Sequence, residues 1–144
     1  MNEFSKKVEI RWSDLDPNFH LRHSVYYDFG AYCRIHFLHE AGITAGVMRQ
    51  HSIGPVLFRE ECLFKREIKF GDQITISLKL RYVSNDFRKF SMVHELLKSN
   101  AETAAILTVD GAWMHTEQRK IVVPPQILID TLNIIPKTDD FAVV

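Results

Sequence analysis

Two acidic residues and two histidines lie close together near the start of the chain, just before a segment with helical spacing. Asp14 and Asp16 are separated by one residue, and His20 and His23 are three residues apart. A carboxylate can attack a carbonyl carbon or activate a water, and unpaired N–H groups at the start of a helix can stabilise the resulting oxyanion. The spacing therefore indicates acid–base chemistry beside a helix N-terminus.

The same residue types also allow simpler interpretations. Asp14 or Asp16 could cap a turn, as aspartate does in many loops. Histidine pairs such as His36 and His39 could contribute to a metal site, but no third ligand is suitably spaced. The sequence contains neither the G-x-S-x-G motif of serine hydrolases nor a Gly-rich phosphate loop. We therefore expect neither a metal nor a cofactor.

A long helix is predicted over residues 24–41, directly after the acidic and histidine residues. Its apolar side chains recur at helical spacing, at Phe29, Cys33 and Phe37. Ser24 is a suitable N-cap, and Gly42 is suited to end the helix. The polar stripe of this helix is narrow, so we expect the helix to be mostly buried.

Alternation of apolar and polar residues dominates the rest of the chain and predicts half-buried strands. Strands are expected at residues 8–12, 56–70 (one strand or a bent pair), 74–82, 90–96 and 104–116, followed by a short helix at 126–132. Turns are expected at Gly71-Asp72, Asn85-Asp86 and Ser99-Asn100, with a bend or bulge at Gly111. This order predicts an α+β domain in which one helix packs on an antiparallel sheet. Such a sheet leaves an open edge, which favours dimerisation by edge pairing.

Composition limits the class of protein. The chain has 144 residues, which suits a single domain over 1–144. Lys plus Arg and Asp plus Glu number 18 each, so no overall charge favours nucleic acid or an anionic membrane as a partner. The sequence predicts a cytoplasmic protein. Its two cysteines lie outside any CxxC pair, and it has neither a signal-peptide pattern nor an apolar run long enough for a membrane span.

The segment from Val8 to Arg34 resembles the opening of the 4-hydroxybenzoyl-CoA thioesterase family. The family pattern is an aromatic residue, D-x-D, six residues, a polar residue, two more and a tyrosine. In this chain the pattern falls on Trp12, Asp14, Asp16, His23 and Tyr26. A second stretch, Phe64–Ile74, resembles the family's strand–turn–strand segment around a Gly-Asp turn. The resemblance follows the element order of nearly the whole chain. It implies a hotdog fold, an antiparallel sheet of about five strands wrapped around one long central helix.

The resemblance also implies an activity and a set of site residues. It implies hydrolysis of an acyl-CoA or acyl-carrier thioester, with Asp16 as nucleophile or general base. The N–H of His23 would face the thioester carbonyl, its imidazole would assist with protons, and Tyr26 would pack or shape the acyl pocket. Arg88 and Lys89 resemble a basic turn that contacts the phosphates of coenzyme A in relatives. The protein is expected to form a homodimer or a tetramer of dimers.

One departure from the family pattern keeps other functions open. Relatives usually carry glycine at one of the positions taken here by Asn18 and Phe19. This departure motivates an alternative, a hotdog protein that binds an acyl-CoA or acyl-carrier ligand without cleaving it. A hydratase or dehydratase is a third hypothesis, but the spacing of Asp16 and His23 fits a thioesterase better.

Overall fold

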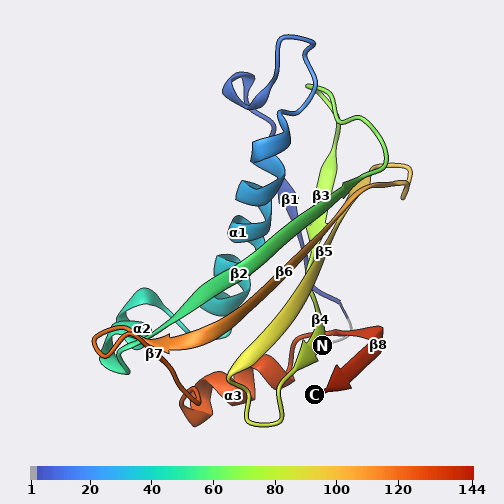
Figure 1. Ribbon diagram of the computed structural model, residues 1–144. Helices are drawn as coiled ribbons and strands as arrows, with labels where there is room; N and C mark the ends of the chain where they lie inside the picture. The colour runs from blue at the N-terminus through green and yellow to red at the C-terminus, as the bar shows by residue number, and fades with distance from the viewer. Residues whose placement is uncertain (1–2) are drawn as a thin grey trace.

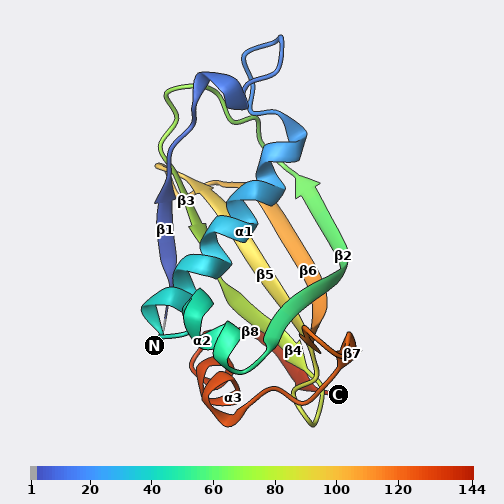
Figure 2. The same ribbon diagram turned by 90° about the vertical axis from the view of Figure 1, so that its left-hand side faces the viewer.

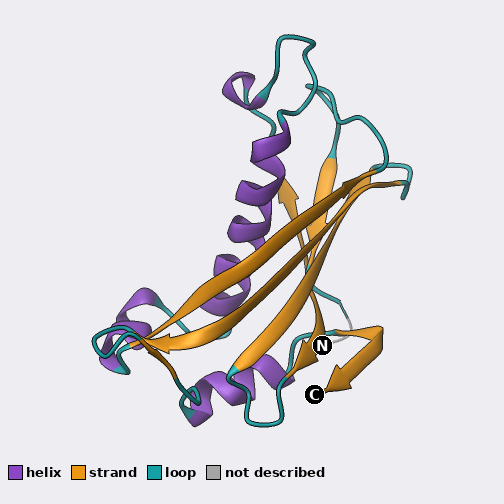
Figure 3. Cartoon of the chain, viewed as in Figure 1, coloured by secondary structure: helices purple, strands orange, loops and turns teal. Residues whose placement is uncertain are grey.

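The computed structural model describes residues 3–144. A curved sheet lies against one long helix, with two short helices at one end (Figures 1, 2 and 3). The helices are α1 (His23–Glu40), α2 (Ala45–Gln50) and α3 (Gln126–Asn133), preceded by a 3-10 turn, η1 (Trp12–Asp14). The strands are β1 (Ser5–Val8), β2 (Ile53–Phe64), β3 (Ile74–Ser77), β4 (Lys79–Val83), β5 (Lys89–Lys98), β6 (Thr103–His115), β7 (Lys120–Ile121) and β8 (Lys137–Val143).

The pairing of the strands forms one sheet with β2 at an edge. β2 pairs with β6, and β6 pairs with β5, in both cases antiparallel. β5 is long enough to pair with β3 near its end and with β4 near its start. β1 then adds to β3, and β8 adds to β4 as a parallel strand. Together with α1 this arrangement confirms the predicted α+β hotdog fold, with eight strands rather than about five.

The core lies between α1 and the inward face of the sheet. Alternation placed Phe90, Met92, His94 and Leu96 on this face, and all four are buried. α1 packs tightly on β6 at Gly30, where an added Cβ would lie 2.4 Å from Leu107 Cδ2. The inward positions of β5 were therefore predicted correctly from their two-residue period.

The limits of α1 agree with the sequence prediction to within a residue, but its cap and burial differ. The N-cap is Arg22 rather than Ser24. Gly42 follows the helix with φ of 90°, in the left-handed region that favours glycine. The expectation of a mostly buried helix was wrong for the single chain, because one face packs on the sheet while Tyr32 and Ile35 are exposed.

A bulge in β2 changes which side chains face inward. The register with β6 shifts between Leu57 and Arg59, so one extra residue, Phe58, is inserted there. An insertion of one residue reverses the alternation, and the predicted even-numbered inward face of 56–70 therefore holds only for the second half of β2. Gly111 lies opposite the bulge, as expected for a bend. An added Cβ there would lie 2.3 Å from the carbonyl oxygen of Val56.

The remaining strand predictions need smaller corrections. The first strand is Ser5–Val8 rather than 8–12, the strand after α1 ends at Phe64, and residues 74–82 divide into β3 and β4. β7, β8 and α2 were not predicted. β8 carries mostly exposed, polar residues, so it gives no hydrophobic alternation. The predicted turns and the short terminal helix are confirmed. None of the helices in residues 3–144 is long and apolar enough to cross a membrane.

Candidate active site

The residues between β1 and α1 form a tight loop whose base is closed by backbone hydrogen bonds. The Arg22 N–H donates to the carbonyl of Asp14 at 2.7 Å, and the Asp16 N–H donates to the carbonyl of His20 at 2.8 Å. The Leu21 N–H donates to Ile68 at 2.7 Å, which ties the loop to the segment after β2. The loop lies at the end of the molecule where α1 begins (Figures 1 and 2).

Asp14 is used to hold this loop together. It is 1% exposed, and its carboxylate accepts hydrogen bonds from the Arg11 N–H at 2.9 Å and from the guanidinium at 2.9 and 3.2 Å. The hydrogen bond from the Arg11 side chain holds the pKa of Asp14 below its usual range. Both carboxylate oxygens are therefore occupied, which suits a structural role.

Asp16 keeps one carboxylate oxygen unshared. The residue is half-buried, and its Oδ1 accepts the N–H groups of Asn18 at 2.8 Å and His20 at 3.1 Å. Asp16 therefore does cap a turn, the simpler of the two interpretations. Its Oδ2 accepts no hydrogen bond from any described residue. The turn fixes the carboxylate and leaves this second oxygen available for chemistry.

Phe19 takes the backbone conformation that glycine would provide. Its φ is 63°, and its N–H donates to the carbonyl of Asp16 at 3.0 Å. The ring of Phe19 is 59% exposed and lies 5.9 Å, centroid to centroid, from the exposed indole of Trp12. The missing glycine of the family pattern is thus replaced by a residue held in a left-handed turn, with an aromatic pair on the outer side of the loop.

Tyr26 is buried in the first turn of α1. Tyr26 is 4% exposed, and its ring packs edge-on against Phe64 at 4.8 Å. Burial first, and the charges of Cys62, Asp16 and Glu67 after it, raise the pKa of Tyr26 to about 12. Tyr26 therefore stays a neutral phenol, which suits packing at the start of α1.

The start of α1 is open. His23 is its first residue and is exposed. The Arg22 cap makes no side-chain hydrogen bond to the helix end, so no side chain caps the first-turn amides. Uncapped first-turn amides are suited to stabilising negative charge on a substrate oxygen.

The start of β5, which follows Arg88 and begins with Lys89, lies at the opposite end of the molecule from the loop between β1 and α1 (Figure 1). Lys89 begins β5, whereas the Asp16 loop is near the end of β5, where Lys98 pairs with Asp72 at 3.4 Å. Ten residues of strand separate the two ends of β5, a distance of roughly 30 Å. Within one chain, these two cations and Asp16 are not parts of one site.

A polar pair beneath α1, a buried histidine and a half-buried arginine, was missed by the sequence interpretation. Arg34 Nη1 lies 3.0 Å from Nε2 of His94, whose Nδ1 lies 2.9 Å from the carbonyl of Ser77. His94 has no exposed surface, and burial lowers its pKa to about 3. The signal was present, because a histidine at an inward strand position is a polar residue in an apolar row.

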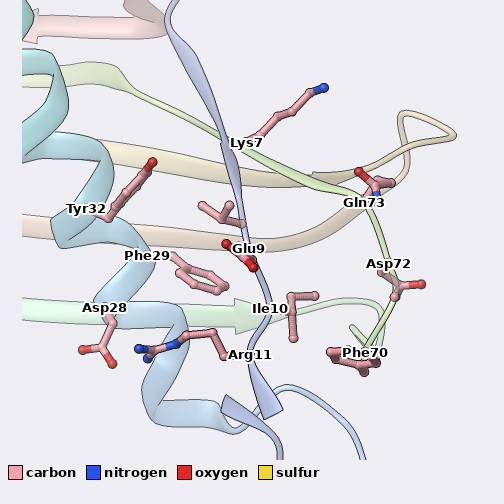
Figure 4. Close-up of a pocket in the computed structure, with 12 residues that line it drawn as sticks. Lys7, Glu9, Ile10, Arg11, Asp28, Phe29, Tyr32, Phe70, Asp72 and Gln73 are labelled. Carbon is pink, nitrogen blue, oxygen red and sulfur yellow. The ribbon is translucent and has the colours of Figure 1, made fainter. Parts of the chain in front are cut away.

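Two cavities flank α1. One, of about 260 Å³, lies between α1 and the sheet and is lined by Arg34 and Trp113 among apolar residues. The other, of about 710 Å³, is open and lies between α1, the segment after β1 and the turn at residues 70–73 (Figure 4). Its charged lining is mixed, with Lys7, Glu9, Arg11, Asp28 and Asp72. Neither cavity is lined by Asp16, and the mixed charges of the larger one do not select an anion.

The described residues, 3–144, contain no cluster of three or more side chains able to hold a metal ion. Comparison with protein families found a match. The family model described as the thioesterase-like superfamily matches residues 10–132. A search of the curated proteins found no match.

Solved structures with the same fold cover almost all of the chain. A hypothetical protein from Aquifex aeolicus is 21% identical with a TM-score of 0.82, and the alignment covers 90% of this chain and 98% of that one. A protein from Staphylococcus aureus, solved in complex with CoA, is 15% identical with a TM-score of 0.83, covering 95% and 88%. A 1,4-dihydroxy-2-naphthoyl-CoA thioesterase from Synechocystis is 12% identical with a TM-score of 0.81, covering 92% and 97%.

Proposed function

We propose, from the premise that this chain belongs to the thioesterase-like superfamily, that it hydrolyses an acyl-CoA or acyl-carrier thioester to a free acid and a thiol. The observation that carries the proposal is the carboxylate of Asp16. Two backbone N–H groups fix one of its oxygens and leave the other unshared. The loop that carries Asp16 closes onto the uncapped start of α1, because the Arg22 N–H donates to the carbonyl of Asp14 at 2.7 Å. The names of two similar structures, a CoA thioesterase and a protein bound to CoA, support the same substrate class.

In the general-base form of the reaction, Asp16 takes a proton from water and the hydroxide attacks the thioester carbonyl carbon. The N–H of His23 donates to the oxyanion of the tetrahedral intermediate. The C–S bond then breaks, and the leaving thiolate takes a proton. The exposed His23 imidazole assists in delivering this proton. In the nucleophilic form, Asp16 itself attacks, the thiolate leaves, and water hydrolyses the mixed anhydride.

The proposed enzyme is a homodimer, or a tetramer of dimers, closed through β2. This strand pairs on one side only, with β6. Its side chains Leu57, Phe58, Leu63 and Phe64 are between 40% and 60% exposed. A long apolar edge strand is a template for pairing with another chain, and a twofold axis closes such a pairing. Arg88 and Lys89 would then contact the CoA phosphates bound at the partner's site, since they are far from Asp16 in their own chain.

The catalytic proposal is tested with Asp16→Asn. Asparagine keeps the Oδ1 acceptor of the turn and replaces the free oxygen by an NH₂ group, so the loop should stay folded. We expect kcat/KM for a panel of acyl-CoAs, measured by thiol release, to fall by about 100-fold or more. The matched control is Asp139→Asn at an exposed position on β8, which should leave the rate unchanged. Equal rates in wild type and the Asp16 variant would remove Asp16 from the mechanism.

The alternative, a binding protein that does not cleave its ligand, gives a different result in the same assay. Tight binding of acyl-CoA without any thiol release by the wild type would favour it. The left-handed Phe19 in the catalytic loop is the observation that motivates this alternative.

The dimer is tested by charge placed on the edge strand. Leu63→Lys should convert a particle of twice the 16.8 kDa chain mass into a monomer, measured by light scattering at micromolar concentration. Val143→Lys, at a similarly exposed apolar position on β8, is the control and should stay dimeric. A monomeric wild type would refute edge closure. The cytoplasmic location stays a prediction.

A further inference from the structure

The cavity of about 260 Å³ beneath α1 has a largely apolar wall that reaches the free edge of the sheet. Most of its lining is buried, including Phe37, Phe90 and Met92. Pro55 and Leu57, which also line it, are exposed and belong to the edge strand β2 (Figure 2). The lining is therefore most accessible at this edge.

Within one chain, packing separates the cavity from the start of α1, where the Asp16 loop lies. Gly30 packs on Leu107 between the two, so closely that an added Cβ would lie 2.4 Å from Leu107 Cδ2. One turn further along the helix, the Arg34 guanidinium lies 3.0 Å from His94. These contacts fill the space that an acyl group at Asp16 would need in order to reach the cavity of its own chain.

The bulge in β2 decides how two copies of this strand can pair. Before the bulge the odd-numbered residues face α1, as the buried Ile53 and the cavity-lining Leu57 show. After it the even-numbered residues do, as Phe64 shows by packing on Tyr26. Directly opposite residues of an antiparallel pair lie on the same face of the sheet. In a twofold pairing of β2 with itself, both halves keep their inward faces only if odd-numbered residues lie opposite even-numbered residues of the partner.

Pairing over the full length of β2 meets this condition, because its odd-numbered first residue then lies opposite the even-numbered last residue of the partner. Pro55, at the accessible edge of the cavity, lies opposite the partner's Cys62, on a strand roughly 5 Å away. Two residues further along is the partner's Phe64, which packs on the partner's Tyr26 in the first turn of α1. The cavity of one chain then adjoins the start of α1 in the other, onto which the loop that carries Asp16 closes.

We infer that this cavity receives the acyl group of a thioester bound at the partner's Asp16, and that it selects apolar acyl groups of about eight to twelve carbons. The inference rests on the proposed thioesterase function and on edge closure through β2, and it names the substrate class. The charged member of the lining, Arg34, is bonded to His94, and the other members are apolar or aromatic, which favours an apolar acyl group.

The volume of the cavity sets the length of the acyl group. At about 30 Å³ per non-hydrogen atom, about 260 Å³ holds roughly eight or nine atoms. A few further carbons would cross the roughly 5 Å between the two strands. Acyl groups much shorter than this leave the cavity unfilled, and much longer ones exceed it.

The length preference is tested with decanoyl-CoA and butyryl-CoA. We expect wild-type kcat/KM to be at least about tenfold higher for decanoyl-CoA, because its longer chain buries more apolar surface. Leu57→Trp fills the accessible edge of the cavity and should lower the rate for decanoyl-CoA by about tenfold, with little change for butyryl-CoA. Met92→Ala enlarges the cavity and should shift the preference toward longer acyl groups. Ile127→Trp, at an exposed position on α3, is the control and should leave the ratio of the two rates unchanged.

A mixed dimer shows which chain supplies the cavity. One chain carries Asp16→Asn and the other Leu57→Trp, with different tags, so that the mixed species can be purified. The working Asp16 then belongs to the chain whose own cavity is blocked. If the acyl group enters the partner's cavity, the ratio of the decanoyl to the butyryl rate should equal that of wild type. A ratio equal to that of the Leu57→Trp homodimer would mean that the acyl group stays within its own chain, and would overturn the inference.

Failure of this inference can be told from failure of the proposed function. A wild type that releases no thiol from any acyl-CoA refutes the proposed function and this inference with it. Equal rates for both thioesters in wild type, or an unchanged ratio in the Leu57→Trp homodimer, overturn the inference alone. If light scattering shows that Leu57→Trp separates the chains, Met92→Ala takes its place in the mixed dimer. A wild-type length preference then supports the inference, and a preference shifted to longer acyl groups overturns it.

Discussion

His94 has no exposed surface and lies beneath α1 with both ring nitrogens in hydrogen bonds. Burial first, and the neighbouring charge of Arg34 second, lower its pKa from 6.5 to about 3. Below pH 6.5 the unfolded chain therefore binds a proton at His94 that the folded chain refuses until about pH 3. The free energy of unfolding should fall as the pH decreases through this interval, and His94 should contribute no pH dependence above it.

The size of this effect follows from the width of the interval. Each pH unit between the two pKa values costs about 1.4 kcal/mol, so at pH 4.5 the fold should have lost roughly 3 kcal/mol through His94 alone. A domain of this size is stable by only about 5 to 15 kcal/mol, so the loss is large enough to measure. Carboxylates titrate in the same range, and a variant comparison is needed to separate them.

The measurement is urea unfolding at pH 7 and pH 4.5 for wild type and His94→Gln. Glutamine can donate to Ser77 and accept from Arg34, but it does not titrate. The variant should lose roughly 3 kcal/mol less than wild type between the two pH values. His51→Gln, at an exposed position, is the control and should follow wild type. An equal loss in wild type and His94→Gln would show that this histidine is not held neutral by its surroundings.

Two further predictions concern the packing of the fold. Gly111→Ala should destabilise the protein by about 2 kcal/mol or more in urea unfolding, because its Cβ would lie 2.3 Å from the backbone oxygen of Val56; Gly46→Ala in α2, with 3.7 Å to its nearest neighbour, should be neutral or stabilising. Burial raises the pKa of Cys33 to about 12 and that of Cys62 to about 11. Both thiols should therefore react slowly with a disulfide reagent at pH 8 in the folded protein and rapidly in urea, and rapid labelling of the folded protein would contradict the burial.

The sequence was sufficient for the elements whose hydrophobic signal is local. The row from Phe90 to Leu96 has a two-residue period because one face of β5 is covered by α1, and that period is visible in the residues themselves. β8 was missed for the opposite reason, since its residues are held by pairing with β4 rather than by burial. The bulge at Phe58 was also not visible, because an inserted residue changes the pairing partner and leaves the composition unchanged.

The residues of the candidate site also fall into two groups, those that a local pattern predicts and those that only the fold can place. Asp16, His23 and Tyr26 lie within eleven consecutive residues, so one closed loop and the start of α1 carry all three, and a local pattern was enough to propose them. Arg88 and Lys89 were assigned to the same site from a resemblance in a turn. The direction of β5, which no local pattern gives, separates them from Asp16 by the length of the strand.

The residues that line the cavity beneath α1 illustrate the limit most clearly. Arg34 comes from the helix and Trp113 from β6, and nothing in either segment indicates that the two side chains share one cavity. A polar group in an apolar row, such as His94, marks the neighbourhood in the sequence, but only the fold shows that its second nitrogen is already used by Arg34. The candidate residues for cleavage could thus be proposed from a short segment. The lining of this cavity could not, because it combines residues about eighty positions apart that only the sheet and the helix together bring to one cavity.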